Sequence, residues 1–395
     1  MMNYDALLSP AAKEMRPSGI RKFFDLASEM PDCISLGVGE PDFATPWIIR
    51  DTAISALEQG KTKYTSNAGL APLREEITRY LSRRFGLSYK ADEILVTVGG
   101  SEAIDLAIRS LVSPGDEVLI PEPCFVCYEP ITTLTGGIPV PLPTTAENGF
   151  RLSAKQVKDA ITEKTKLLIL PYPNNPTGAV LPESELEEIA AVLRDTNVFV
   201  LSDEIYAELY YGKDPYISFA RLPGMKERTV YVNGFSKTYA MTGWRLGYAA
   251  GPLPVIQLMK KIHQSCIMCA PTMSQYAAIT ALRSADEEIE RMRSEYDTRR
   301  RYMVKKLNEI GLTTFDPEGA FYVFPDIRST GLTSEEFREQ LLRSKQVAVI
   351  PGNAFGSSGE GYVRISYAYS YAHLEKAVNR IVAFLKEISS PSYER

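Results

Sequence analysis

The stretch EILVTVGGSEAIDLAIRSLV, residues 93–112, joins a short β-branched run, a pair of glycines and an amphipathic run of helical period. This pattern predicts a buried strand, a sharp turn and a helix that packs back on the strand. The same alternation recurs along the middle of the chain, from EVLIPE (117–122) to PVIQLMKKIHQS (254–265). Strands that alternate with helices predict an α/β fold whose mostly parallel sheet is covered by helices on both faces.

The last part of the chain has a different pattern. A long charged run, DEEIERMRSEYDTRRRYMVKKLNEIG (286–311), predicts one helix, while AFYVFP and YVRISYA predict short strands in an antiparallel arrangement. These elements indicate a second, smaller α+β domain. We expect an N-terminal arm at 1–15, a large domain at 47–285 and a small domain that combines 16–46 with 286–395.

Composition and charge argue against several classes of protein. The 395 residues are 45% hydrophobic and carry a formal net charge of −5, so a large core is available but no basic face for nucleic acid. The first residues show no signal-peptide pattern, and no apolar run approaches the roughly 18 residues of a membrane helix. We therefore expect a cytoplasmic globular protein that binds neither nucleic acid nor membranes.

The cysteines and histidines give little support for a metal site. Four of the five cysteines form two pairs with the C-x-x-C spacing of zinc sites, CFVC (124–127) and CIMC (266–269). The pairs lie far apart, and the second falls in a partly helical run, so we expect buried free thiols and no metal. His263 and His373 adjoin helix-like runs and are expected to be structural.

Polar residues follow four of the predicted strands. In parallel sheets, ligands collect beyond the carboxyl ends of the strands. The residues at those ends are Gly99, Gly100, Ser101 and Glu102 after EILVTV, Asn174 and Asn175 after KLLILPYP, Asp203 after NVFVLS, and Ser236 and Lys237 after TVYVNGF. A carboxylate, an amide, an amine and a glycine-led helix start therefore converge on one edge of the sheet.

Lys237 lies in NGFSKTYAMTGWRLGY (233–248), a run with almost no countercharge. Burial would lower the pKa of its amine and make it a nucleophile that forms a Schiff base with an aldehyde, although a lysine with a buried stem and a solvated head is the alternative. Asp203 follows an apolar strand and needs a partner, which is either the next turn of a helix or a cationic ring. Pyridoxal phosphate supplies both the aldehyde and the ring.

The remaining strand-end residues have two interpretations each. The glycine-led helix start at Ser101 is either an ordinary capped helix or a phosphate site, and Arg245 either adds a forked charge there or forms a structural ion pair. Asn175 is either a turn residue or a donor to the phenolic oxygen of the cofactor. Tyr206, expected one helical turn after Asp203, would donate to the same oxygen.

Taken in order, NNPTG around Asn175, SDEIY with Asp203 and Tyr206, and SK with GWRLGY around Lys237 resemble the class I aminotransferases. These are pyridoxal-phosphate enzymes of fold type I. The resemblance covers nearly the whole chain, from ISLGVGEPDFATP to YVRISYAYS. It is closest to the bacterial and archaeal group of aspartate, aromatic and N-acetyl-diaminopimelate aminotransferases.

The resemblance implies roles for the matching residues. Lys237 would form the Schiff base and move the Cα proton, Asp203 would hold the pyridinium nitrogen, and Tyr206 would bind the phenolic oxygen. The other cofactor-binding residues would be Gly100, Ser101, Glu102, Phe125, Asn175, Ser236 and Arg245, with Tyr64 from a second subunit of a homodimer. The substrate would be bound by Arg364, Asn175, Gly39 and Ile20.

The implied activity is a ping-pong transfer of an amino group from an aromatic, dicarboxylic or acyl-diaminopimelate-like amino acid to a 2-oxo acid such as 2-oxoglutarate. Ser101 stands where aspartate-preferring relatives commonly carry a basic residue, which puts a strict preference for aspartate in doubt. Glu102 stands where relatives commonly carry glutamine. The alternatives are a pyridoxal-phosphate-dependent C–S β-lyase and a non-catalytic ligand sensor, although the chain keeps Lys237 and has no fused basic DNA-binding segment.

Overall fold

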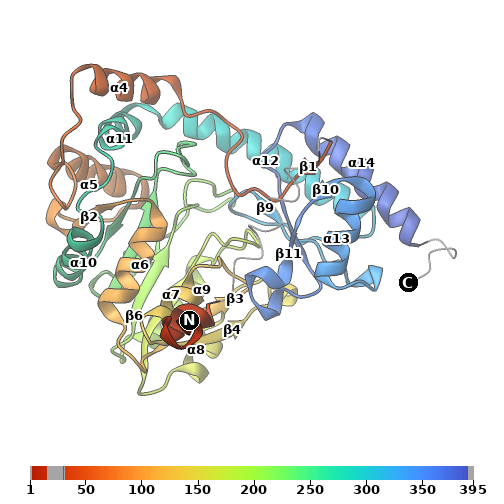
Figure 1. Cartoon of the computed structure of the whole chain (residues 1–395), viewed down its shortest axis with the longest axis horizontal. Coiled ribbons are helices and arrows are strands. Elements are labelled where there is room, and N and C mark those ends of the chain that lie inside the picture. The colour runs from red at the N-terminus through yellow and green to blue at the C-terminus, as the bar shows by residue number, and fades with distance from the viewer. Residues whose placement is uncertain (1, 16–29, 31, 390–395) are drawn as a thin grey trace.

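A computed structural model describes residues 2–15, 30 and 32–389 (Figure 1). Its largest sheet has seven strands in the order β2-β8-β7-β6-β5-β3-β4. The strands are β2 (Ile94–Thr97), β3 (Glu117–Glu122), β4 (Ile138–Pro143), β5 (Thr165–Leu170), β6 (Phe199–Asp203), β7 (Thr229–Gly234) and β8 (Gly247–Ala250). Only β8 runs antiparallel to its neighbours, β2 and β7. The predicted α/β fold with a mostly parallel sheet is therefore confirmed.

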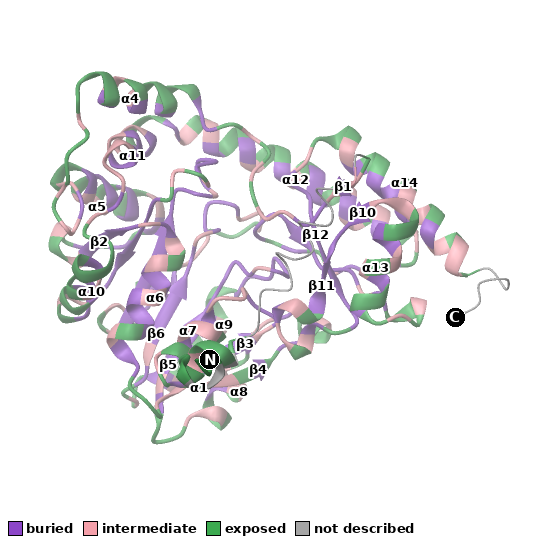
Figure 2. Ribbon diagram, viewed as in Figure 1, coloured by how far each residue is buried: buried purple, intermediate pink, exposed green. Residues whose placement is uncertain are grey.

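Helices cover both faces of this sheet. One face packs against α6 (Gly100–Leu111), α7 (Tyr128–Leu134) and α10 (Leu253–Cys266). The opposite face packs against α4 (Trp47–Glu58), α5 (Ala71–Phe85) and α11 (Thr272–Ser284) at the β2 end, and against α8 (Ala154–Ala160) and α9 (Glu183–Leu193) at the β3 end. Figure 2 shows the resulting burial, with the central strands buried and the outer helix faces exposed. The central strands are therefore shielded from solvent on both faces of the sheet.

The remaining elements are β1, near the start of the chain, and those that follow a long helix, α12 (Asp286–Glu309) (Figure 1). They are α13 (Ser334–Lys345), α14 (Tyr371–Ile388), β1 (Ile34–Ser35), β9 (Tyr322–Val323), β10 (Val347–Ala348), β11 (Ile350–Pro351) and β12 (Val363–Ser366). As predicted, β11, β12 and β9 form an antiparallel sheet, but β1 and β10 form a separate parallel pair. The seven-stranded sheet falls within 47–285 and the small sheets outside it; the exact domain boundaries stay a prediction.

The N-terminal arm contains two short helices, α1 (Tyr4–Leu7) and α2 (Pro10–Glu14), and α2 contacts α7. No helix in the described part of the chain is long and apolar enough to cross a membrane. Strand β4 has the sequence IPVPLP, which the alternation did not predict. Its prolines suit an edge strand, because an edge strand needs only half of its ladder bonds, and β4 does lie at the edge of the sheet.

The segment after Asp203 differs from the prediction of a helix. Residues 205–208 form turns, with bonds such as Leu209 N–H to the Tyr206 carbonyl at 2.8 Å. Two buried glutamates bind tertiary partners instead: Glu204 accepts from Ser218 Oγ at 2.7 Å, and Glu208 accepts from Tyr80 Oη at 2.6 Å. These distant contacts outweigh the local pattern of EIYAEL.

Candidate active site

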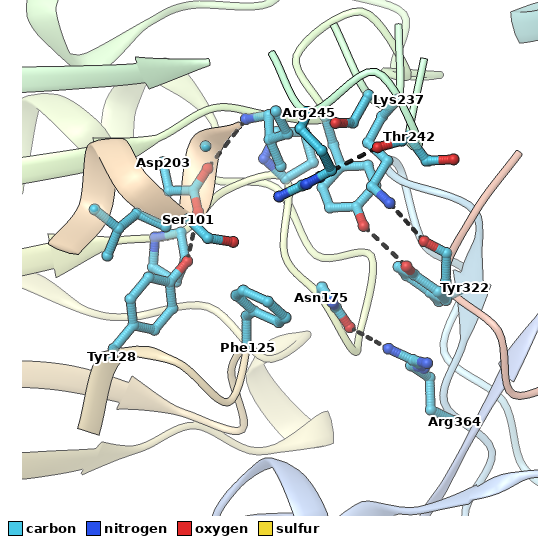
Figure 3. A pocket seen from close by; sticks show the side chains of 18 residues that line it. Ser101, Phe125, Tyr128, Asn175, Asp203, Lys237, Thr242, Arg245, Tyr322 and Arg364 are labelled. Atoms are coloured by element: carbon cyan, nitrogen blue, oxygen red, sulfur yellow. Dashed lines mark hydrogen bonds between the residues drawn. The ribbon is translucent and has the colours of Figure 1, made fainter. Parts of the chain in front are cut away.

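A cavity of about 290 Å³ opens beyond the carboxyl ends of β5, β6 and β7 (Figure 3). It is the expected place for a ligand in a sheet of this kind. It is lined by Gly39, Gly100, Ser101, Ile104, Phe125, Tyr128, Pro171, Pro173, Asn175, Asp203, Ile205, Tyr206, Ser236, Lys237, Thr242, Arg245, Tyr322 and Arg364. Most residues predicted from the strand ends and from the resemblance therefore meet in one cavity.

Lys237 follows β7 in a turn and borders the cavity with part of its side chain. Its ammonium group donates a hydrogen bond to the Gly39 carbonyl at 2.5 Å. Burial lowers the pKa of Lys237 to about 8, a shift that Glu40 opposes and that the charges of Arg364 and Arg245 reinforce. An amine with this pKa is partly neutral near neutral pH, so it can act as a nucleophile or a base.

Asp203 ends β6 and is only 6% exposed. Its carboxylate accepts a hydrogen bond from Tyr128 Oη at 2.7 Å and one from the Ile205 N–H at 3.2 Å. Burial raises the pKa of Asp203, and these two donors offset part of that rise. A cationic group in the cavity would stabilise the carboxylate further, so the site fits a protonated ring nitrogen.

The start of α6 forms a cradle against Arg245. Gly99 precedes the helix with φ +79°, and a Cβ added there would lie 2.7 Å from Arg245 Nη2. A Cβ on Gly247 would likewise meet the Gly100 nitrogen at 2.6 Å. Arg245 itself has a positive φ of 51°, a strained backbone of the kind found at functional sites. Free amides and a guanidinium at one point fit a phosphate group.

Arg364, from β12, forms the opposite wall of the cavity. Its Nη1 donates to Asn175 Oδ1 at 2.8 Å (Figure 3), and its Nη2 donates to the Gly37 carbonyl at 2.6 Å. Burial lowers the pKa of Arg364, and its Nε atom is buried without a hydrogen-bond partner. No carboxylate forms an ion pair with Arg364 in the described part of the chain. A buried cation without a countercharge calls for an anionic ligand.

Tyr206 has a partner that the sequence did not indicate. Its hydroxyl lies 2.8 Å from the hydroxyl of Tyr322, and both side chains line the cavity (Figure 3). Tyr128, Gly37 and Thr242 were missed as well. Tyr128 adjoins the CFVC pair, and Gly37 and Thr242 lie within ISLGVGEPDFATP and NGFSKTYAMTGWRLGY, but no local pattern indicates where each of them points.

Glu102 turns away from the cavity. Its Oε1 lies 2.7 Å from Nδ1 of the fully buried His263, and its Oε2 accepts from the Val98 N–H. Only the backbone amide of Glu102, in the first turn of α6, is left to face a ligand. Tyr64 is 81% exposed and outside the cavity lining, as a residue offered to a second subunit would be. Ile20 lies outside the described residues.

The cysteines only partly match the prediction of buried thiols. All five are free, but Cys124 alone is buried, whereas Cys266 is exposed at the end of α10. Cys124 and Cys127 flank Phe125, whose ring borders the cavity. The described residues contain no group of three or more His, Cys, Asp or Glu side chains that could hold a metal ion.

Comparison with known proteins gives a consistent result. Residues 31–381 match the family described as Aminotransferase class I and II. The aspartate aminotransferase of Pyrococcus abyssi is 49% identical over 376 residues, covering 94% of this chain and 97% of that protein. Aromatic-amino-acid aminotransferase 2 of Thermococcus litoralis is 46% identical over 383 residues, covering 96% and 98%.

A solved structure agrees with these relatives. The aspartate aminotransferase of Thermus thermophilus with maleate matches with a TM-score of 0.92 at 38% identity, covering 95% of this chain and 99% of that chain. No finding favours the C–S β-lyase. The relatives carry different amino acids in their names at similar identity, so similarity alone does not select a substrate.

Proposed function

The chain belongs to the class I and II aminotransferases and is a pyridoxal-phosphate-dependent transaminase, and we propose which of its residues perform the reaction and which donor they accept. The supporting observation is that Lys237, Asp203 and Arg364 border one cavity from three directions. An amine, a buried carboxylate and an unpaired buried guanidinium are the groups that this transamination requires.

Pyridoxal phosphate, when bound, supplies an aldehyde for amines and a ring that delocalises the electrons released at Cα. Asp203 would hold the ring nitrogen, and its carboxylate is kept in position by Tyr128 and the Ile205 amide. The first amides of α6, with Ser101, Ser236 and Arg245, would bind the phosphate. Phe125 would stack on the ring, and Asn175 and Tyr206 would bind the phenolic oxygen.

Lys237 then moves the proton. Its amine has a pKa of about 8, so near neutral pH it would take the proton from Cα and deliver it to the cofactor carbon C4′ at little cost. Arg364 forks onto the α-carboxylate of the amino acid, assisted by Asn175 and the backbone at Gly39. This fixed orientation turns the Cα–H bond toward the lysine. Arg364 therefore speeds the proton transfer by orienting the substrate and not by changing the acidity of Cα.

The donor is an amino acid with an aromatic side chain in preference to aspartate. Among the described residues, the cavity is bordered by three cationic side chains, Lys237, Arg245 and Arg364. All three have roles toward the cofactor or the α-carboxylate. None is left for a second carboxylate, and Ser101 is uncharged. An acyl-diaminopimelate-like donor is less well matched, because it also carries a distal charge.

The enzyme works as a cytoplasmic homodimer. Trp47 and Tyr64 are exposed large aromatic side chains, at 62% and 81%, on or near α4. Ile54 and Leu57 of α4 are exposed as well, at 45% and 48%, and several exposed apolar side chains on one helix favour an interface. Tyr64 of the second subunit completes the phosphate site.

A single half-reaction tests the proposed donor. The holoenzyme is mixed in turn with phenylalanine, tyrosine and aspartate, without an oxo acid, and the loss of the lysine-linked cofactor absorption is timed. We expect aromatic donors to react faster than aspartate by about 10-fold or more, the value of one unpaired buried charge, and 2-oxoglutarate to restore the absorption. Faster reaction with aspartate would overturn the donor preference.

A further inference from the structure

Tyr322 lies between two parts of the active site. It is carried by β9, and β9 pairs with β12, the strand that carries Arg364. Its hydroxyl is 2.8 Å from the hydroxyl of Tyr206, which follows β6 of the large sheet. The guanidinium carbon of Arg364 lies 4.4 Å from the centre of its ring (Figure 3). One side chain therefore contacts both the cofactor end and the carboxylate end of the cavity.

The backbone at Gly39, which borders the cavity, leaves room for the Tyr322 hydroxyl. A Cβ added to Gly39 would lie 2.5 Å from the Tyr322 hydroxyl oxygen, so only glycine leaves room for it. The carbonyl of the same Gly39 accepts the hydrogen bond from Lys237. The fit of Tyr322 against Gly39 thus also sets the position of an acceptor for the lysine.

The two hydroxyls have a defined direction once Tyr206 is engaged. Both phenols are buried, and burial raises the pKa of each, so both stay protonated at working pH. A phenol carries one hydrogen. If Tyr206 donates its hydrogen to the phenolic oxygen of the cofactor, Tyr322 must donate to Tyr206. Each donor in such a chain strengthens the next one.

We propose that Tyr322 is a positioning residue that acts at both ends of the active site: its hydroxyl strengthens the Tyr206 donor, and its ring holds the Arg364 guanidinium in place. This inference rests on the proposed role of Tyr206 toward the phenolic oxygen. It assigns the two effects to different atoms of one side chain. They can therefore be separated by substitution.

The hydroxyl effect is tested by titrating the visible absorption of the holoenzyme with pH. A hydrogen bond to the phenolic oxygen stabilises the form of the chromophore that has lost its proton, because that form carries more negative charge on the oxygen. Tyr322→Phe should therefore raise the midpoint by about 0.3 to 1 unit, a fraction of one hydrogen bond. In a Tyr206→Phe background the same substitution should leave the midpoint unchanged, because its effect passes through Tyr206.

The ring effect is tested by the KM of the amino-acid donor. Tyr322→Phe keeps the ring and should leave KM within about 2-fold, whereas Tyr322→Leu should raise it by about 10-fold, the value of a desolvated cation–π contact. Tyr367→Phe is the matched control. Tyr367 is fully buried in the same core, and its hydroxyl bonds to the Ala320 carbonyl at 3.1 Å, away from the cavity lining. It should change neither the midpoint nor KM.

The outcomes separate this inference from the proposed function. If Tyr206→Phe leaves the midpoint unchanged, the proposed role of Tyr206 is wrong, and the inference is wrong with it. If Tyr206→Phe raises the midpoint but Tyr322→Phe does not, or if Tyr322→Phe acts equally in both backgrounds, the inference alone is overturned. An unchanged KM in Tyr322→Leu would remove the part that concerns Arg364.

Discussion

At the scale of single residues, Lys237 shows a conflict between stability and function. The fold buries an amine that water would stabilise as a cation, which lowers the pKa from 10.5 to about 8. At a pH where the lysine is charged in the unfolded chain, that shift lowers the free energy of unfolding by about 3 kcal/mol. Since part of the side chain borders the cavity, this value is an upper bound. The same burial makes the amine reactive.

Lys237→Met should therefore stabilise the cofactor-free protein while abolishing activity. Between pH 8 and 10.5 the unfolded chain binds a proton that the folded protein does not, so the stability of the wild type rises with pH through this window. We expect the variant to be more stable by up to about 3 kcal/mol at pH 7, with the difference shrinking toward pH 10. Urea unfolding at the two pH values measures it.

Lys155→Met serves as the control for that measurement. The Lys155 side chain is 84% exposed, so its removal should change stability little and with no trend across the same window. A Lys237→Met variant that is less stable than the wild type at pH 7 would show that the lysine is not held as a buried amine.

At the scale of elements, the turn between β2 and α6 forms the proposed phosphate site. Gly99→Ala would place a methyl group 2.7 Å from Arg245 Nη2 and strain a backbone with φ +79°. We expect the dissociation constant of pyridoxal phosphate to rise by about 10- to 100-fold, because a charged hydrogen bond is displaced. The constant is measured by absorption titration of the cofactor-free protein.

Gly224→Ala is the control that separates backbone strain from the displacement of the Arg245 side chain. Gly224 has nearly the same φ, +77°, but an added Cβ would meet no atom within 4 Å. Both variants should lose about 1–3 kcal/mol of stability, because a side chain strains either backbone, yet only Gly99→Ala should weaken cofactor binding. Equal effects on the dissociation constant would argue against a phosphate at the start of α6.

The positions of the strands explain which residues of the candidate site the sequence could predict. Lys237, Asp203, Asn175 and the start of α6 could be predicted, because strand ends in a parallel sheet share one edge. Tyr128 and Tyr322 could not, because they meet their partners across 75 and 116 positions of the chain. No local pattern encodes such contacts. The prediction of a helix after Asp203 was wrong for the same reason, because Glu204 and Glu208 bind distant partners that stabilise turns at 205–208.

At the scale of the whole molecule, we expect the exposed apolar face of α4 to lie in the proposed dimer interface. Trp47 and Ile54 lie two turns apart, so they share one face, and they are 62% and 45% exposed. Trp47→Asp should convert the proposed dimer into monomers and reduce activity as the protein is diluted, measured by light scattering and by specific activity. Tyr371→Asp, at a 48% exposed position outside the proposed interface, should leave the dimer intact.

The central claim is that Lys237 carries the cofactor, and chemical trapping tests it most directly. The holoenzyme is treated with borohydride, digested and examined by mass spectrometry. Lys237 should be the modified residue, and prior reaction with an amino-acid donor should prevent the modification, because the cofactor has then left the lysine. Modification of another lysine, or a Lys237→Ala protein that is still yellow and active, would contradict the account.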